Sequence, residues 1–197
     1  MEPFTKIKSV ATPLDKVNVD TDQIIPKQFL KLIQKTGFGQ YLFYDWRYEI
    51  NGVQRKDFVL NDSRYRNSKI LLTRGNFGCG SSREHAAWAL SDFGFRVIIS
   101  TSFADIFYSN CFKNGILPIK ISEQMLSKLF ESESEIEVDL ENQTIKNNED
   151  MYISFEIEPH WKRTLLEGLD DIAITLRHED EISRYENTQR NSGVRVS

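Results

Sequence analysis

Short apolar runs alternate with amphipathic stretches through the middle of the chain. The runs at residues 69–75 (KILLTRG) and 96–100 (RVIIS) are apolar enough to be strands buried on both faces, and a third, ILPIKI, begins at Ile116. Two stretches with helical spacing lie between them, and each meets a glycine, Gly94 or Gly115, where a helix end is expected. The order strand, helix, strand, helix, strand predicts parallel strands joined by right-handed crossovers.

The two helices differ in their predicted packing. We expect the first from about Arg83 to Phe93. In the second, the spacing predicts one buried face, made of Phe103, Ile106, Phe107 and Cys111.

Other patterns occupy the two ends of the chain. A short strand-like segment, KIKSV, precedes the turn-rich stretch NVDTDQIIP, whose Asp20, Thr21 and Asp22 are typical of turns and helix N-caps. Farther on, SEIEVDLENQTI and MYISFEIEP alternate apolar and polar residues and predict half-exposed strands. The final third is helical in pattern, and Gly168 is expected to separate a short helix from a longer one. Its apolar positions recur at helical spacing: Leu165, Leu166, Leu169, Ile172, Leu176 and Ile182.

The patterns predict a single α/β domain with a mostly parallel central sheet. We expect it to span residues 1–159, with a helical C-terminal extension of the same domain at 160–189 and a flexible tail at 190–197. The 197 residues, 40% of them apolar, are enough for one compact core.

Composition narrows the functional classes. A net charge of −4 without a long basic run argues against a nucleic-acid partner. The apolar runs are strand-sized, which argues against a membrane span, and the N-terminus lacks a secretory signal pattern, so cytoplasm is the expected location. Cys79 and Cys111 form no CxxC pair, and since an iron–sulfur cluster generally needs three or four thiolates, we expect no cluster bound by this chain alone.

The most informative stretch is the loop GNFGCGSSRE, which joins a predicted strand to a predicted helix. Gly78 and Gly80 allow positive φ or a close approach, and the helix N-terminus directs free N–H groups at the loop. Arg83 adds a planar fork suited to a carboxylate or phosphate, and Ser81 and Ser82 add hydroxyls. The loop is therefore a candidate anion site.

Several alternatives compete at this loop. Ser81 and Glu84 fit a capping box, and Ser82 could equally be the N-cap, so the serines could have no role beyond the helix. Three other motifs do not fit. A Walker A loop needs a lysine that is absent here, and a dinucleotide fingerprint needs a small residue where Arg83 stands. A serine hydrolase needs G-x-S-x-G and a placed His–Asp pair, whereas His85 lies within the adjacent helical turn. Elimination favours a carboxylate-binding loop. Cys79 is either a reactive thiol or a small residue in a tight turn.

The motifs NFGCGSSREHAAWAL and SFADIFYSNCFKNGILP, with VDTDQIIPKQFL upstream, resemble the small-subunit family of 3-isopropylmalate dehydratase (isopropylmalate isomerase). That subunit is similar to the swivelling β/β/α domain of the aconitase superfamily. The C-terminal LLEGLDDIAITLRHEDEISRYE also resembles the bacterial form, so the resemblance covers essentially the whole chain.

The resemblance implies a hydro-lyase of leucine biosynthesis that interconverts 2-isopropylmalate and 3-isopropylmalate through isopropylmaleate. It implies activity only in a heterodimer with a large subunit that bears a [4Fe–4S] cluster, and a dicarboxylate substrate. A related hydro-lyase acting on another acid, of the homoaconitate or citramalate type, and a non-catalytic anion-binding module are the alternative hypotheses. An intact Ser81-Ser82-Arg83 argues against the last of these.

The resemblance also implies roles for single residues. Ser81 matches the catalytic serine, which as an alkoxide removes a proton next to a carboxylate, with Gly80 and Arg83 suited to stabilising the negative oxygen. Ser82 and Arg83 match the residues that bind the substrate carboxylate. A second arginine of the superfamily is absent from KQFLKLIQ, which offers Lys27 and Lys31 instead. Three apolar neighbours could contact an isopropyl group or simply pack on the core: Phe29, Leu30 and Leu32.

Overall fold

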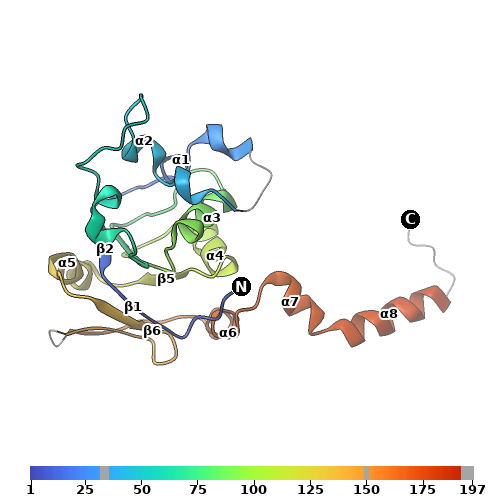
Figure 1. The fold of residues 1–197 in the computed structure, drawn as a ribbon. Helices are drawn as coiled ribbons and strands as arrows, with labels where there is room; N and C mark the ends of the chain where they lie inside the picture. The colour runs from blue at the N-terminus through green and yellow to red at the C-terminus, as the bar shows by residue number, and fades with distance from the viewer. Residues whose placement is uncertain (32–35, 149–150, 192–197) are drawn as a thin grey trace.

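A four-stranded parallel sheet forms the middle layer of the computed structural model, which describes residues 1–31, 36–148 and 151–191 (Figure 1). Its strands, in spatial order, are β2 (Ala11–Leu14), β3 (Ile70–Thr73), β4 (Val97–Ser100) and β5 (Leu117–Lys120). Every residue of β3 and β4 is buried because both faces of the sheet are covered. The predicted parallel arrangement is confirmed.

A second, antiparallel sheet of four strands lies against the first. Its order is β1 (Lys6–Ser9), β6 (Ile136–Asp139), β7 (Thr144–Asn147) and β8 (Tyr152–Ser154), so the alternating segments are strands as predicted. The N-terminal segment, expected to hold one short strand, instead holds two that belong to different sheets. Strand β2 was missed because ATPL has no apolar run and contains Pro13, which an edge strand tolerates.

The two faces of the parallel sheet contribute to two cores. On the helical side, Leu71 and Ile98 pack with α1 (Thr21–Ile24), α3 (Glu84–Phe93) and α4 (Asp105–Lys113). The opposite face packs against the antiparallel sheet, α5 (Glu123–Glu131) and α6 (Pro159–Glu167). The layers are therefore sheet, sheet and helices, the β/β/α arrangement expected from the resemblance. Between α1 and β3 the chain also forms α2 (Tyr44–Arg47) and short 3₁₀ segments at Lys27–Lys31, Gly39–Tyr41, Val59–Asn61 and Ser63–Tyr65.

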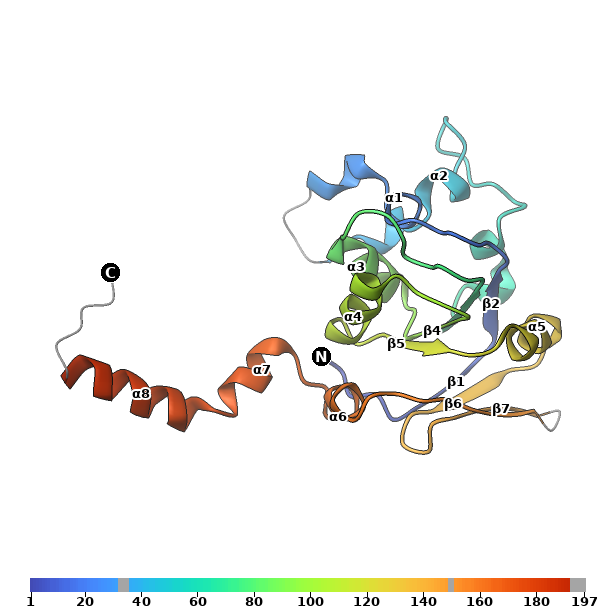
Figure 2. The same ribbon diagram turned by 180° about the vertical axis from the view of Figure 1, so that it is seen from behind.

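The C-terminal helices depart from the predicted pattern. Gly168 has a φ of +66° and ends α6 as expected, but the longer helix predicted after it is two helices, α7 (Asp171–Leu176) and α8 (Glu179–Asn191). Both run away from the two sheets (Figures 1 and 2), and Ile172 is 71% exposed because the body of the protein does not reach it. Of the predicted tail, residues 192–197 lie outside the described part, and the boundary at residue 160 stays a prediction. None of the described helices is long and apolar enough to span a membrane.

The connection between β6 and β7 is held by one carboxylate. Asp139 accepts hydrogen bonds from the backbone N–H and the side-chain amide of Asn142, both at 2.9 Å, and Lys6 Nζ lies 3.2 Å from it. These donors favour the ionised form and lower the pKa of Asp139 from 3.8 to about 2.

A depressed carboxyl pKa stabilises the fold above the unfolded-state pKa and loses that effect as the pH falls through the folded-state value. We therefore expect the free energy of unfolding to decrease between about pH 4 and pH 2, and Asp139→Asn to remove part of that decrease. Urea unfolding across this range measures it, with Glu141→Gln as an exposed neighbouring control. An unchanged pH dependence in Asp139→Asn would contradict the assignment.

Candidate functional site

The glycine-rich loop, residues 75–83, lies beside the segment that leads into α1 (Figure 2). The Gly78 N–H donates to the Val19 carbonyl at 2.7 Å, and the Thr21 N–H donates to the Cys79 carbonyl at 2.9 Å. The Thr21 hydroxyl donates to the Ser81 carbonyl at 2.8 Å. Two stretches that the sequence marks separately, about 60 residues apart, therefore form one structural unit.

The start of α1 follows the predicted helix punctuation. Asp20 is its N-cap, and its carboxylate accepts from the Gln23 N–H at 2.7 Å. The Gln23 side chain in turn accepts from the Asp20 N–H at 2.9 Å, which completes a capping box. This rigid turn holds the backbone against which the glycine-rich loop is hydrogen-bonded.

Two positions of the loop require glycine, because a side chain there would be strained or would meet a neighbouring atom. Gly78 and Gly80 have φ of +76° and +87°, which confirms the predicted positive-φ positions. A Cβ on Gly78 would lie 2.1 Å from Cγ of Phe107, so an added methyl group cannot fit without movement. At Gly80 the nearest atom to an added Cβ is Cβ of Asp20, at 3.3 Å.

The structure contradicts the alternative that Ser81 or Ser82 caps the helix. Helix α3 begins at Glu84, its N-cap is Arg83 in extended conformation, and no side chain caps it. Glu84 is thus the first helical residue rather than the third, and its carboxylate accepts from the Asn114 amide at 3.1 Å instead of reaching back. Both serines are exposed in the loop.

Arg83 is mostly buried, with 13% of its side chain exposed, and its Nη1 forms an ion pair with Asp22 of α1. Lys27 Nζ lies 3.5 Å from the second Asp22 oxygen. A guanidinium has five N–H donors, so the pair fixes Arg83 while leaving capacity for another acceptor. The sequence did not predict that Asp22 pairs with Arg83. Asp22 was interpreted only as a residue typical of turns and helix N-caps, and its partner lies 61 positions away.

A cavity of about 250 Å³ adjoins the loop. Gly78, Gly80, Ser82 and Arg83 form one side, and Ala104 to Phe107, at the start of α4, form the other. The prediction that Ile106 is buried is wrong: it is 57% exposed, because α4 buries Phe107, Cys111 and Phe112 and turns Ile106 toward this cavity. Ser81 belongs to the same loop but is not among the residues that line the cavity.

The described residues that directly follow α1 pack on the helical core or face solvent, and they do not line the cavity beside the loop. Phe29 stacks on Tyr41 with ring centroids 4.0 Å apart and, like Leu30, packs against the helical core. Leu30 and Lys31 do not line the cavity beside the loop, and Lys31 is exposed. Phe29 therefore packs on the core, which is the second of the two alternatives given for it. Leu32 lies outside the described residues.

Cys79, Cys111 and His85 have structural surroundings. Burial and the Asp20 carboxylate raise the pKa of Cys79, which argues against an activated thiol there. Cys111 is fully buried in the helical core, as predicted. His85 packs against Phe38 and Trp88, at centroid distances of 5.4 and 4.5 Å. Within the described part of the chain, no group of three or more His, Cys, Asp or Glu side chains could hold a metal ion.

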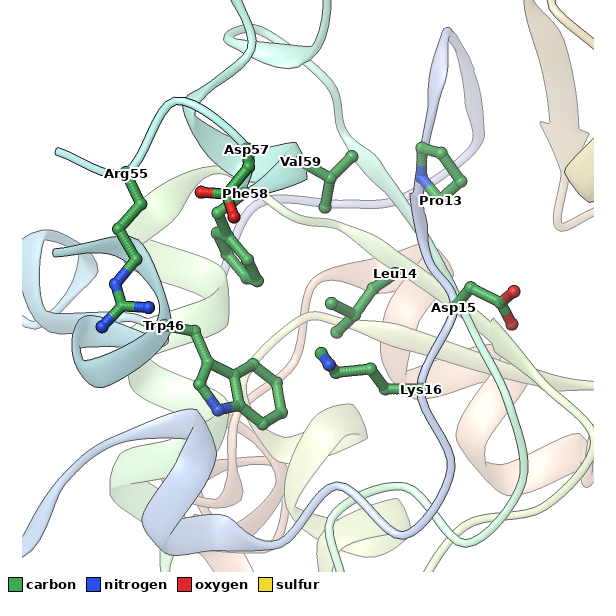
Figure 3. A pocket seen from close by; sticks show the side chains of 9 residues that line it. All are labelled: Pro13, Leu14, Asp15, Lys16, Trp46, Arg55, Asp57, Phe58 and Val59. Atoms are coloured by element: carbon green, nitrogen blue, oxygen red, sulfur yellow. The ribbon is translucent and has the colours of Figure 1, made fainter.

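A second cavity, of about 330 Å³, lies between β2 and the segment around α2 (Figure 3). The Lys16 ammonium lies over the Trp46 ring, 5.0 Å from its centroid, and Asp57 and Arg55 line the same rim. No residue singled out by the sequence lines this cavity, so the glycine-rich loop remains the candidate site.

Comparisons with known proteins agree with this arrangement. The Aconitase C-terminal domain family matches residues 1–124, and the family of the C-terminal domain of the 3-isopropylmalate dehydratase small subunit matches residues 171–192. A 3-isopropylmalate dehydratase small subunit from Brevibacillus brevis is 55% identical over 94% of this chain and 98% of that protein. One from Bacillus subtilis is 52% identical over the full length of both. The crystal structure of 3-isopropylmalate dehydratase from Methanocaldococcus jannaschii matches with a TM-score of 0.69 and 25% identity, over 91% of this chain and 99% of that one.

The close approach at Gly78 makes a testable prediction. Gly78→Ala should destabilise the protein by about 1–3 kcal/mol more than Gly52→Ala, because both residues have positive φ but only Gly78 faces a neighbouring side chain. Urea unfolding of the two variants measures the difference. Equal losses of unfolding free energy would show that the loop does not press against Phe107.

Proposed function

The chain belongs to the 3-isopropylmalate dehydratase small-subunit family and is a component of a hydro-lyase of leucine biosynthesis, and we propose that residues 75–83 form its share of the active site. The reaction interconverts 2-isopropylmalate and 3-isopropylmalate through isopropylmaleate. One observation carries the proposal: Ser82, which is exposed, and Arg83, which is mostly buried, line the same cavity, and neither Ser82 nor its exposed neighbour Ser81 caps a helix.

In this proposal Arg83 and Ser82 bind a substrate carboxylate. The planar guanidinium can donate two parallel hydrogen bonds to the two carboxylate oxygens, and the Ser82 hydroxyl adds a third donor at the same cavity. Asp22 acts as a positioning residue, since its ion pair holds the Arg83 side chain beside the loop. Lys27 adds positive charge near Asp22 and offsets part of its effect on an anionic substrate.

Ser81 is the proposed base, which removes the proton from the carbon next to the bound carboxylate. A serine hydroxyl resists ionisation, so its surroundings must stabilise the negative oxygen. The Arg83 charge and the N-terminal end of α3, a helix of ten residues, are suited to this. The Thr21 hydroxyl, which donates to the Ser81 carbonyl, fixes the backbone from which the Ser81 side chain projects.

The remaining parts of the site belong to a partner in this proposal. The described residues do not fit an iron–sulfur cluster, because Cys111 is fully buried and Cys79 is not part of any group of three or more metal-binding side chains among them. A [4Fe–4S] cluster on a separate large subunit would supply the metal chemistry, and the two chains would act together in the cytoplasm. The relatives are named as small subunits, which supports such a complex.

Reconstitution tests the proposal. The chain is mixed anaerobically with a cluster-bearing large subunit, and isopropylmaleate is followed by its absorbance. Ser81→Ala should leave complex formation intact and lower kcat by about a hundredfold to ten-thousandfold, as expected for loss of a general base. Ser63→Ala, at an exposed turn, is the matched control. Turnover that survives Ser81→Ala would exclude Ser81 as the base, and a complex of wild-type subunits without turnover would exclude the function.

The carboxylate contact makes a separate prediction. Arg83→Lys should raise KM about tenfold or more, because an ammonium keeps the charge but cannot make the two-pronged contact. Steady-state kinetics of the reconstituted complex measure it, with Arg163→Lys on the exposed side of α6 as control. A KM equal to that of the wild type would show that Arg83 does not bind substrate.

A further inference from the structure

We propose that residues 169–191, which we call the C-terminal arm, bind the large subunit in an apolar groove with a basic rim. This inference rests on the complex proposed above and deepens it. The arm comprises α7 and α8, which extend from α6 away from both sheets (Figure 2). Among the described residues, none of those in α7 or α8 belongs to either hydrophobic core.

The arm presents apolar side chains to solvent at helical spacing. Ile172 and Leu176, four positions apart on α7, are 71% and 58% exposed. Ile182 and Tyr185, three positions apart on α8, are 40% and 67% exposed. Residues at these spacings lie on one face of a helix, so each helix has an apolar face in water. A partner that covers these faces gains free energy by removing apolar surface from water.

The helices of the arm are short for helices that pack on neither sheet. α7 has six residues and α8 has thirteen. Isolated helices shorter than about 12–15 residues are marginal in water, and most helical stability in proteins comes from packing of an amphipathic face. In the arm the apolar faces are the exposed ones. Packing of these faces against a partner therefore stabilises the helical form of the arm.

The first helix of the arm is held in place where it leaves the body of the protein. Gly168 ends α6 with positive φ, and the Leu169 N–H donates to the Thr164 carbonyl at 2.9 Å. Arg177, directly after α7, forms an ion pair with Glu167 of α6. Because these contacts already orient α7, binding through the arm loses less conformational entropy than binding through a free tail.

The charge of the arm favours a basic partner over a second copy of this chain. Residues 170–191 contain six acidic side chains and three arginines. Three of the acidic residues are consecutive at the start of α8: Glu179, Asp180 and Glu181. Two arms packed together would bring these like charges close, which opposes self-association. Lys or Arg side chains around an apolar groove of a different chain would instead attract them.

The family matches favour the large subunit as that different chain. The match to the Aconitase C-terminal domain ends at residue 124, whereas residues 171–192 match a domain named for the 3-isopropylmalate dehydratase small subunit. Nearly the whole arm thus matches a domain named for small subunits, and a small subunit by name has a larger partner.

Anaerobic titration of a cluster-bearing large subunit with the full-length chain tests the inference by measuring the Kd of the complex. Two double variants are compared with the wild type: Ile172→Ser with Leu176→Ser, and Ile182→Ser with Tyr185→Ser. The matched control is Ile50→Ser with Tyr152→Ser, which changes the same two residue types at exposed positions outside the arm.

We expect each arm variant to raise the Kd about tenfold to hundredfold, because a few buried apolar or aromatic side chains supply most of the binding energy of an interface. An effect in only one variant would narrow the contact to that helix and still support the inference. The kcat at saturating large subunit should stay at the wild-type value, since none of the four side chains lines the cavity beside the glycine-rich loop. Urea unfolding of the free chain should also be unchanged, because these side chains are exposed there.

A charge variant tests the basic rim separately. Glu179→Lys with Asp180→Lys should raise the Kd about tenfold at low ionic strength, and high salt should remove most of the difference from the wild type. A Kd that this variant leaves unchanged or lowers at low salt would contradict a basic rim.

Three further results would overturn the inference. A wild-type Kd in both apolar arm variants would show that the arm does not bind the large subunit, and it would leave the proposed function standing. Self-association of the free chain that the arm variants abolish, measured by sedimentation, would assign the apolar faces to a second copy. A wild-type chain that forms no complex with the large subunit would remove the proposed function, and the inference with it.

Discussion

Hydrogen bonds between the start of α1, with the residues just before it, and the glycine-rich loop determine the geometry of the site. The Val19 carbonyl accepts from the Gly78 N–H, and the N–H and hydroxyl of Thr21 donate to the carbonyls of Cys79 and Ser81. The backbone can follow this path only because Gly78 takes positive φ and lies against Phe107. As a consequence, α1 and the start of α3 meet, and the Asp22 carboxylate reaches Arg83.

The middle parallel sheet explains why the loop and the start of α4 share a cavity. The loop follows β3 and α4 follows β4, and these neighbouring strands are parallel, so both connections leave from the same edge. Ligands of open α/β sheets bind outside this carboxyl edge of the strands. The bridge between Phe77 and Phe103 continues the pairing of the two strands beyond the sheet and keeps both connections in register.

Local patterns predicted the parts of this structure that depend on neighbouring residues. Buried strands, the positive φ of Gly78 and Gly80 and the N-cap at Asp20 all follow from short-range sterics and hydrogen bonding. The Asp22–Arg83 pair could not be predicted because the two residues are far apart in the sequence. The alternative that a serine caps α3 fits the S-x-x-E pattern, but the helix begins only at Glu84, and the backbone of Ser81 is hydrogen-bonded to Thr21. Ile106 was misplaced because helical spacing shows a face but not what lies beside it.

The most direct test of the proposed site is the structure of the reconstituted complex with a bound isopropylmalate or an unreactive analogue. We expect a substrate carboxylate within hydrogen-bonding distance of both Arg83 and Ser82, with Asp22 still paired to Arg83 and the Ser81 hydroxyl facing the carbon that loses its proton. A carboxylate bound away from Arg83, with residues 75–83 making no contact to the ligand, would contradict the proposed site.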